Sequence, residues 1–357
     1  MRSPLKVFAG AGELSGDQIL SSLLQGLRGH FPDMEVCGFG GPFSESQGLK
    51  SFLPIDRLAV NGIGDVLRRS LLLVPAYFRL KKKLGDFKPD LVLLVDYPGM
   101  NIRLARHAKR LGFSVHYVAP PQLWAYRNPS RRLHRLRRML AGVSLQVLFP
   151  FEAEMYASWA VRLSQGHFFS MPLESSATGN RLLLCPGSRR NVLRRNLPLW
   201  LNRLSATGWK NGVDVLVPEF LAAEARVLAA PWPDVEVFTH SVQVFSRTVA
   251  AISFPGTMTL ELFLHRIPTQ IWAVLDPLTL QVGRKKLRSR FTALPNLLSG
   301  MEIFPEWVGT VRDFKRQPPV FHPQSAVRNE DVLEIQRKIG SAEGVAIGVR
   351  ACLELLL

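Results

Sequence analysis

The stretch LKVFAGAGELSGD (5–17) joins an apolar run to a glycine-containing turn. Residues 5–12 are apolar almost without interruption, which is typical of a strand buried on both faces of a sheet. From Asp17 to Gly29, leucine and isoleucine recur at helical spacing. A buried strand followed directly by a helix is the repeating unit of a parallel α/β sheet, so the first thirty residues already predict this fold class.

Short apolar runs alternate with helical patterns along the rest of the chain. We expect further strands in a first series at 34–41, 90–96, 113–119 and 144–149, separated by helices around 66–83, 102–111 and 130–141. Gly, Ser, Pro and Thr then collect between Ser164 and Asn180, where we place a linker. A second series of expected strands covers 181–187, 213–219, 235–240, 249–256 and 269–275.

The alternation predicts two doubly wound, Rossmann-like α/β domains that face each other across a cleft. The expected domains are 1–168, which binds an acceptor and associates with a membrane, and 181–335, which binds a nucleotide sugar. A C-terminal helix over 336–357 is expected to pack back on the first domain or on a partner subunit.

The charge of the chain indicates an anionic partner. Lys and Arg number 45 against 28 Asp and Glu, a balance of +17. Nucleic acid, an anionic membrane surface and phosphorylated substrates all fit such an excess, as does a charge spread over solvated helix faces. The basic stretches are not part of a DNA- or RNA-binding motif, so we expect no nucleic acid partner.

Neither a metal site nor a membrane span is expected from the composition. The three cysteines have no closely spaced partner, and the eight histidines form no cluster with metal-ligand spacing. No run of 18 apolar residues occurs. The N-terminus lacks the apolar core of a signal peptide, so we expect the chain to stay in the compartment where it is made.

The carboxyl ends of the strands are where open α/β sheets bind ligands. In the turn AGELSGD (11–17), Gly12 permits a close backbone approach, and Ser15 or Asp17 is placed to cap the next helix. Asp96 follows five apolar residues, and at a strand end a carboxylate can act as general base toward a hydroxyl. A capped turn at residues 11–17 and a helix cap or salt bridge at Asp96 are the structural alternatives.

The segment VAPPQLWAYR (118–127) follows another expected strand. Its two prolines restrict the loop, and Trp124, Tyr126 and Arg127 offer aromatic faces and a cation to sugar rings or acyl chains. Packing of Trp124 in the core is the alternative.

Two strand ends of the second domain suit a nucleotide. In CPGSRR (185–190), Gly187 and Ser188 offer hydrogen-bond donors and Arg189 a guanidinium for phosphate. In FPGTMTLE (254–261), Gly256 ends a strand.

Thr257 is expected to cap the following helix, whose N-terminus suits a pyrophosphate, and Glu261 can accept from two ribose hydroxyls. A cap and a carboxylate matched to the helix dipole are the alternatives for these two residues. Asn296 lies in the otherwise apolar loop LPNLLSG (294–300).

Together these segments resemble the lipid-A-disaccharide synthase family. The likeness also includes KPDLVLLVDYPGMN (88–101), LFPFEAEMY (148–156), ALPNLLSG (293–300) and FPEWV (304–308). It implies a GT-B fold and an inverting transfer of 2,3-diacylglucosamine from UDP onto 2,3-diacylglucosamine 1-phosphate. The products would be lipid A disaccharide 1-phosphate and UDP, formed without a metal or a cofactor, and the family also implies a homodimer.

The resemblance implies a role for each matching residue. Asp96 would be the catalytic base. The acceptor side would comprise Gly12, Glu13, Ser15, Asn101, Trp124, Tyr126 and Arg127. The UDP side would comprise Gly187, Ser188, Arg189, Gly256, Thr257, Glu261 and Asn296.

Several positions depart from the family pattern. Gly99, Pro255 and Val192 stand where the family has Asp, Ser and Glu. Two alternatives therefore stay open: a divergent relative that acts on another UDP-sugar, and a catalytically weak protein that binds a membrane surface.

The segment IGDVLRRSLLLVPAYFRLKKK (63–83) is too short and too charged to span a membrane. It can lie in the membrane interface with its cations on anionic headgroups, and Pro75 is expected to kink or divide it. An ordinary amphipathic surface helix is the alternative. The resemblance favours the membrane and implies a cytoplasmic protein, peripheral on the inner face of the inner membrane. The expected contacts are Val66, Leu67, Leu71, Leu72, Leu73 and Phe78.

Overall fold

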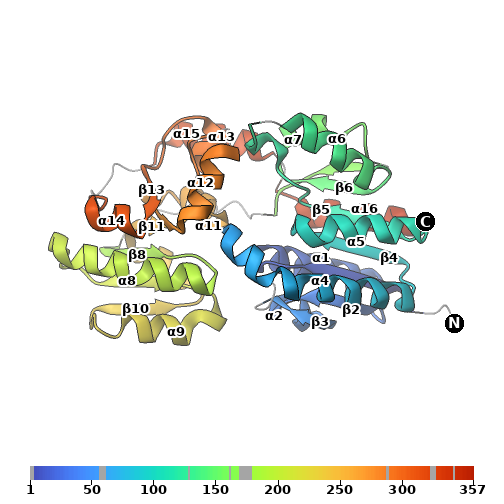
Figure 1. Cartoon of the computed structure of the whole chain (residues 1–357), viewed down its shortest axis with the longest axis horizontal. Helices are drawn as coiled ribbons and strands as arrows, with labels where there is room; N and C mark the ends of the chain where they lie inside the picture. Colours follow the sequence, from blue (N-terminus) through green and yellow to red (C-terminus); the bar gives the residue numbers. More distant parts are fainter. Residues whose placement is uncertain are drawn as a thin grey trace. The chain divides into compact units, whose positions relative to one another are not determined.

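The computed structural model describes residues 4–55, 62–127, 129–160, 162–168, 179–286, 289–321, 327–340 and 342–357. They form two compact units, each built on one parallel sheet (Figure 1). Unit 1 comprises Met1–Val60, Asp65–Ser170 and Lys338–Leu357, and unit 2 comprises Asn61–Gly64 and Met171–Arg337. Two doubly wound α/β units confirm the predicted fold class.

Unit 1 contains a seven-stranded parallel sheet. Its order is β3 (Leu49–Pro54), β2 (Glu35–Gly40), β1 (Lys6–Ala11), β4 (Leu91–Val95), β5 (Ser114–Val118), β6 (Ser144–Val147) and β7 (Leu163–Gln165). The helices of this unit are α1 (Leu14–His30), α2 (Pro42–Ser46), α4 (Gly62–Phe87), α5 (Pro98–Arg110), α6 (Pro129–Leu140), α7 (Pro150–Tyr156) and α16 (Gly344–Leu356).

Alternation along β1 explains why both faces of this sheet are covered. Val7 and Ala9 pack with leucines of α1, such as Leu24, and with side chains of α16. Phe8 points to the other face and packs with α4 and α5. Successive side chains of a strand point to opposite faces, so a run that is apolar at every position needs helices on both sides.

Unit 2 repeats the arrangement with six parallel strands. Their order is β10 (Val235–Phe238), β9 (Val213–Leu216), β8 (Arg181–Cys185), β11 (Thr248–Ser253), β12 (Thr269–Leu275) and β13 (Glu306–Thr310). The helices are α8 (Arg190–Thr207), α9 (Glu219–Ala229), α10 (Val242–Phe245), α11 (Thr257–Leu264), α12 (Pro277–Lys286), α13 (Leu294–Ser299), α14 (Val311–Arg316) and α15 (Asn329–Ile339).

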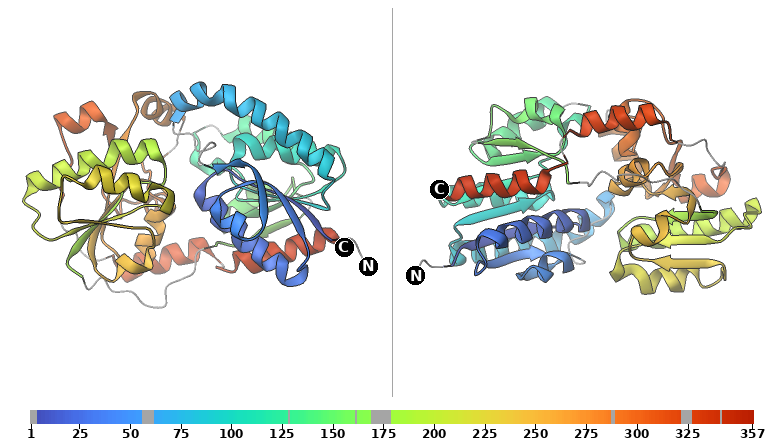
Figure 2. Two further views of the ribbon diagram at one scale, coloured as in Figure 1. Left: turned by 90° about the horizontal axis from the view of Figure 1, so that it is seen from below. Right: turned by 180° about the vertical axis from the view of Figure 1, so that it is seen from behind.

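The C-terminal segment differs from the single helix predicted over 336–357. α15 ends at Ile339, where Gly340 adopts a left-handed conformation with φ +74°, and α16 begins at Gly344. α16 lies against α1 and β5 in unit 1 (Figure 2). Its first residue is anchored by Gln146, whose Nε2 donates to the Gly344 carbonyl at 2.8 Å.

Three strands were not anticipated, and each lies at an edge of its sheet: β3, β7 and β13. Their sequences mix polar and apolar residues, because an edge strand is less enclosed than a central one. Pro75 does not divide the segment, since α4 continues through it as one helix of 26 residues.

The expectations from composition can be compared with the described residues. No helix among them is both long and apolar enough to cross a membrane. Cys37, Cys185 and Cys352 are buried free thiols.

The anchor of α16 yields a prediction for Gln146→Leu. The substitution leaves the buried Gly344 carbonyl without its donor, so the free energy of unfolding should fall by about 1–3 kcal/mol. Amide hydrogen exchange in α16 should accelerate. Urea unfolding and exchange read by mass spectrometry measure both effects, and Gln25→Leu on the exposed side of α1 is the control. Unchanged exchange in α16 contradicts the anchor.

Candidate active site

The carboxyl ends of β1 and β4 meet at the centre of the unit 1 sheet. Ala11 pairs with Val95 in register, and the strand order reverses direction between these two strands. The next residues, Gly12 and Asp96, therefore lie at the switch point where open α/β sheets bind ligands. Gly12 cannot carry a side chain, because an added Cβ would lie 2.2 Å from the ring of Tyr97.

Asp96 and Tyr97 form a strained corner. Both adopt the left-handed region, with φ of 46° and 48°, which costs a residue other than glycine about 1–3 kcal/mol. Three hydrogen bonds hold the corner. The Asp96 N–H donates to the Val118 carbonyl at 2.9 Å, and the Asp96 carbonyl accepts from Asn101 Nδ2 at 2.8 Å and from the Tyr117 hydroxyl at 3.0 Å.

The Tyr117 hydroxyl remains protonated in this position. Burial raises the pKa of Tyr117 well above its usual value, and the neighbouring Asp96 carboxylate raises it further. Tyr117 therefore stays a donor to the Asp96 backbone, and the corner is a fixed feature of the site.

Asn101 requires a correction. It was predicted to contact substrate, but it is buried, and its Nδ2 also lies 3.0 Å from the Val95 carbonyl and 3.3 Å from the Gly10 carbonyl. Its Nδ2 thus fixes the ends of β1 and β4, while its buried Oδ1 has no hydrogen-bond partner among the described residues.

The turn after β1 carries Glu13 and Ser15, but the cap of the following helix is not the predicted one. α1 begins at Leu14, and Glu13 is its N-cap residue without a capping side-chain bond. Ser15 therefore lies within the first turn. The buried Asp17 carboxylate instead accepts from the N–H groups of Gly41 and Phe43 at the start of α2. Asp17 is a structural residue that joins α1 to α2.

The aromatic loop after β5 is held by α7. Trp124 is half-buried, and its Nε1 donates to Glu152 Oε1 at 2.9 Å. The Tyr156 hydroxyl donates to the Pro121 carbonyl in the same loop. Glu152 and Tyr156 are four residues apart and so lie on one face of α7. Packing and hydrogen bonding thus position Trp124, while Tyr126 and Arg127 follow it at the more open end of the loop.

Burial raises the pKa of Glu152 to about 7, although bonds from Trp124 and from the Phe149 and Leu148 N–H groups lower it. These bonds satisfy both carboxylate oxygens, at 2.9 Å and 3.1 Å. The Glu152 carboxyl that holds Trp124 therefore changes its protonation state near neutral pH.

Unit 2 has a switch point of the same kind. Cys185 at the end of β8 pairs with Ser253 at the end of β11, and the strand order reverses between them. Gly187, Ser188 and Arg189 follow β8, with Arg189 as the N-cap residue of α8. Their backbone therefore reaches the edge of the sheet where a phosphate can meet a helix N-terminus.

The start of α11 faces the same edge. Gly256 is the N-cap residue and has open space where a side chain would be. Thr257 was predicted to be the cap, but it is the first helical residue. The side-chain hydrogen bond at this helix start comes from Thr259 instead, whose hydroxyl donates to the Gly256 carbonyl at 2.7 Å.

Glu261 is buried enough for its pKa to be raised, with a hydrogen bond from Ser241 acting in the opposite direction. Burial, and to a smaller extent the charge of Glu261, raise the pKa of Cys185 at the end of β8.

Asn296 does not suit its predicted role at the nucleotide. It is buried, its Nδ2 donates to the Phe304 carbonyl and to Glu306, and its Oδ1 accepts from the N–H groups of Ile303 and Phe304. These bonds use the whole amide, so we correct the assignment: Asn296 closes the turn after α13.

The predicted membrane contacts lie on α4. Phe78 is 59% exposed, whereas Leu73 is half-buried and packs against the core. The side chains of Val66, Leu67, Leu71 and Leu72 lie outside the described residues.

Three residues that shape the site were missed from the sequence: Tyr117, Glu152 and Tyr156. The spacing of Glu152 and Tyr156 within FEAEMY (151–156) was the available signal, since both project from one helix face. In the described part of the chain, no group of three His, Cys, Asp or Glu side chains could hold a metal ion.

Comparison with known proteins identifies relatives along most of the chain. The sequence model of the family described as lipid-A-disaccharide synthetase matches residues 7–337. A lipid-A-disaccharide synthase from Azotobacter vinelandii is 33% identical over 330 residues, which cover 86% of each chain.

Two solved structures share the fold at low sequence identity. A UDP-N-acetylglucosamine 2-epimerase from Rickettsia bellii has a TM-score of 0.53 at 12% identity, over 99% of this chain and 96% of that one. The calicheamicin glycosyltransferase CalG4 has a TM-score of 0.51 at 15% identity, over 99% and 98%. The fold is thus common to epimerases and glycosyltransferases, and the choice between reactions depends on the site.

The raised pKa of Glu152 predicts a pH-dependent stability. In the folded state this carboxyl holds its proton up to about pH 7, against an ordinary pKa of 4.5. The stabilisation is therefore complete below about pH 4.5 and is lost as the pH rises through 7. Between pH 5 and pH 8, the free energy of unfolding of the wild type should fall by about 2–3 kcal/mol relative to that of Glu152→Gln, because glutamine does not titrate.

Urea unfolding at several pH values measures this difference. Glu154→Gln, an exposed neighbour on α7, should keep the wild-type profile. Parallel profiles for the wild type and Glu152→Gln contradict the assignment.

Proposed function

Because the chain belongs to the lipid-A-disaccharide synthetase family, we propose that it transfers 2,3-diacylglucosamine from UDP to 2,3-diacylglucosamine 1-phosphate. The products are lipid A disaccharide 1-phosphate and UDP. The observation that carries the proposal is the corner at Asp96, where a carboxylate at the sheet switch point is held in a strained conformation by buried donors. Such strain is typical of functional positions.

Asp96 is the general base of the proposed reaction. Its carboxylate accepts the proton of the acceptor 6-hydroxyl while that oxygen attacks the anomeric carbon of the donor. The bond from the anomeric carbon to UDP breaks as the new bond forms, so one displacement inverts the configuration. Asn101 and Tyr117 act as positioning residues, because they bind the Asp96 backbone rather than the substrate.

The remaining edge of unit 1 suits the acceptor. Gly12 follows β1, which pairs with the strand before Asp96, and together with Glu13 and Ser15 it offers backbone and side-chain groups to a sugar. Trp124, held by Glu152, and the neighbouring Tyr126 and Arg127 offer aromatic surface and a cation.

Unit 2 supplies the proposed UDP site. The pyrophosphate binds the N-terminal ends of α8 and α11 through Gly187, Ser188, Arg189, Gly256 and Thr257. These donors stabilise the negative charge that develops on the departing UDP. Glu261, in the second turn of α11, accepts from the ribose hydroxyls. No metal or cofactor takes part in this scheme.

The acylated substrates place the reaction at a membrane. We propose a protein that works as a homodimer on the cytoplasmic face of the inner membrane, with α4 toward the anionic lipid surface. The net charge of +17 and the exposed Phe78 support this location.

The first test concerns Asp96→Asn. Loss of the base should lower turnover by about 10²–10⁴-fold in detergent micelles, without changing the circular dichroism spectrum. Turnover is read from the mass of the disaccharide product, which also separates transfer from the chemistry of another UDP-sugar. Asp33→Asn, an exposed carboxylate of unit 1, is the control. Near-normal turnover of Asp96→Asn removes this residue from the mechanism.

The second test concerns UDP. Arg189→Ala should raise the Kd for UDP by roughly 10–100-fold, since a charge-assisted hydrogen bond contributes about 1.5–3 kcal/mol. Arg190→Ala is the matched control, because the exposed Arg190 already pairs with Glu224 at 3.3 Å. Isothermal titration calorimetry measures both. Absence of UDP binding by the wild type refutes the donor site and favours a protein that only binds membrane surfaces.

A further inference from the structure

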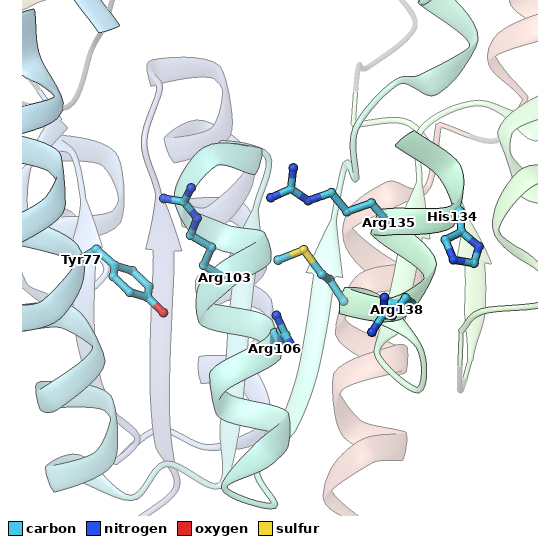
Figure 3. A pocket seen from close by; sticks show the side chains of 7 residues that line it. Tyr77, Arg103, Arg106, His134, Arg135 and Arg138 are labelled. Carbon is cyan, nitrogen blue, oxygen red and sulfur yellow. The ribbon is translucent and has the colours of Figure 1, made fainter. Parts of the chain in front are cut away.

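A basic hollow of about 600 Å³ lies among three helices of unit 1, apart from the sheet edge that carries Asp96 (Figure 3). α5 and α6 supply four arginines, and α4 contributes an aromatic side chain. The lining residues are Tyr77, Arg103, Arg106, His134, Arg135, Arg138 and Met139.

The four arginines converge by helix geometry. Arg103 and Arg106 are three residues apart on α5, and Arg135 and Arg138 are three apart on α6, so each pair projects from one helix face. All four side chains surround the hollow (Figure 3). Each guanidinium group offers paired N–H donors that can bind two oxygens of a phosphate.

The positive charge of the hollow is not neutralised within the described residues, where none of these four arginines forms an ion pair with a carboxylate. The sequences of α5 and α6 contain no Asp or Glu at all. Like charges gathered around one hollow repel each other, and a bound anion relieves that repulsion.

A smaller hollow of about 110 Å³ extends the basic region along α5. It adds Lys81, His107 and Arg110 to the lining. The pKa of His107 is lowered, first by burial and then by the charges of Lys81 and Arg110. His107 thus stays neutral in the positive field that its neighbours create.

An exposed apolar stripe borders the hollow. On α4, Val74 is 51% exposed and Phe78 is 59% exposed. The ring centroid of Phe78 lies 5.5 Å from that of Tyr77, which lines the hollow. A soluble phosphate makes no apolar contacts, so it would not account for the exposed valine and phenylalanine beside the hollow. A lipid presents its phosphate and its apolar chains together, and both features of this face match it.

We propose that the hollow between α5 and α6 binds the phosphate group of an anionic membrane phospholipid, while Val74 and Phe78 enter the interface beside it. The proposal deepens the membrane part of the proposed function and rests on it. Arg106 lies eight residues into α5, about 12 Å along the helix from its first residue, which follows the Asp96 corner. Arg103 lies five residues after the first residue of α5, about 7.5 Å along the helix, and we assign the bound lipid the role of a membrane anchor.

The test compares two pairs of substitutions in the full chain. The hollow pair is Arg106→Gln with Arg138→Gln. The control pair, Arg79→Gln with Arg137→Gln, removes the same charge from exposed positions of α4 and α6 that do not line either hollow. Flotation with phosphatidylcholine vesicles, with and without phosphatidylglycerol, measures binding. The hollow pair should bind the phosphatidylglycerol vesicles at least about tenfold more weakly than the control pair.

Three results overturn the proposal. Equal losses in the two pairs indicate a diffuse basic surface without a discrete site. The hollow is assigned to free phosphate if two results occur together: inorganic phosphate binds the wild type but not the hollow pair, and the hollow pair binds vesicles as well as the control pair does. A single-stranded oligonucleotide bound more tightly than the vesicles at the same salt, and lost in the hollow pair, assigns it to nucleic acid.

Turnover in detergent micelles separates this proposal from the proposed function. The hollow pair should keep wild-type turnover there, because no bilayer is required, and a loss of turnover contradicts the separation from Asp96. If the wild type shows no turnover, the proposed transferase function is wrong. Vesicle binding still tests the lipid site in that case, because it is measured without any sugar substrate.

Discussion

Backbone pairing between β1 and β4 fixes Ala11 opposite Val95. The segments that follow the two strands then leave the sheet toward opposite faces, α1 toward one and α5 toward the other. This divergence opens the edge at which Gly12 and Asp96 lie. Asn101 and Tyr117 stabilise the corner at Asp96 by binding its carbonyl, and Gly12 leaves room for Tyr97. β8 and β11 diverge in the same way in unit 2, so one backbone arrangement creates both predicted ligand edges.

The sequence predicted the central strands well because they are buried on both faces and therefore apolar throughout. It predicted the edge strands β3, β7 and β13 poorly, because their polar positions resemble loops. The positions of Asp96, Gly187 and Gly256 at strand ends were also predictable, since strand ends follow directly from strand assignment. Hydrogen-bond partners distant in sequence, such as Tyr117 for Asp96 and Glu152 for Trp124, carry no local pattern and were not predicted.

The motif residues fall into two groups that sequence alone could not separate. Asp17, Asn101 and Asn296 have side chains whose hydrogen bonds connect one backbone segment to another. Glu13, Asp96 and Arg189 belong to the residues at the open ends of the strands. Polar residues of both groups occur beside apolar runs, and only their hydrogen bonds distinguish a structural amide or carboxylate from one placed to meet a ligand.

The docking of α16 on α1 has a consequence for how the chain folds during synthesis. Val349 and Cys352 complete the same core to which Val7 and Leu24 belong. The ribosome produces these residues only after all of unit 2. Unit 2 can therefore close its core while it emerges, whereas one sheet face of unit 1, although synthesised first, stays partly uncovered until α16 has been made. The order of synthesis and the order of completion are thus reversed in this protein.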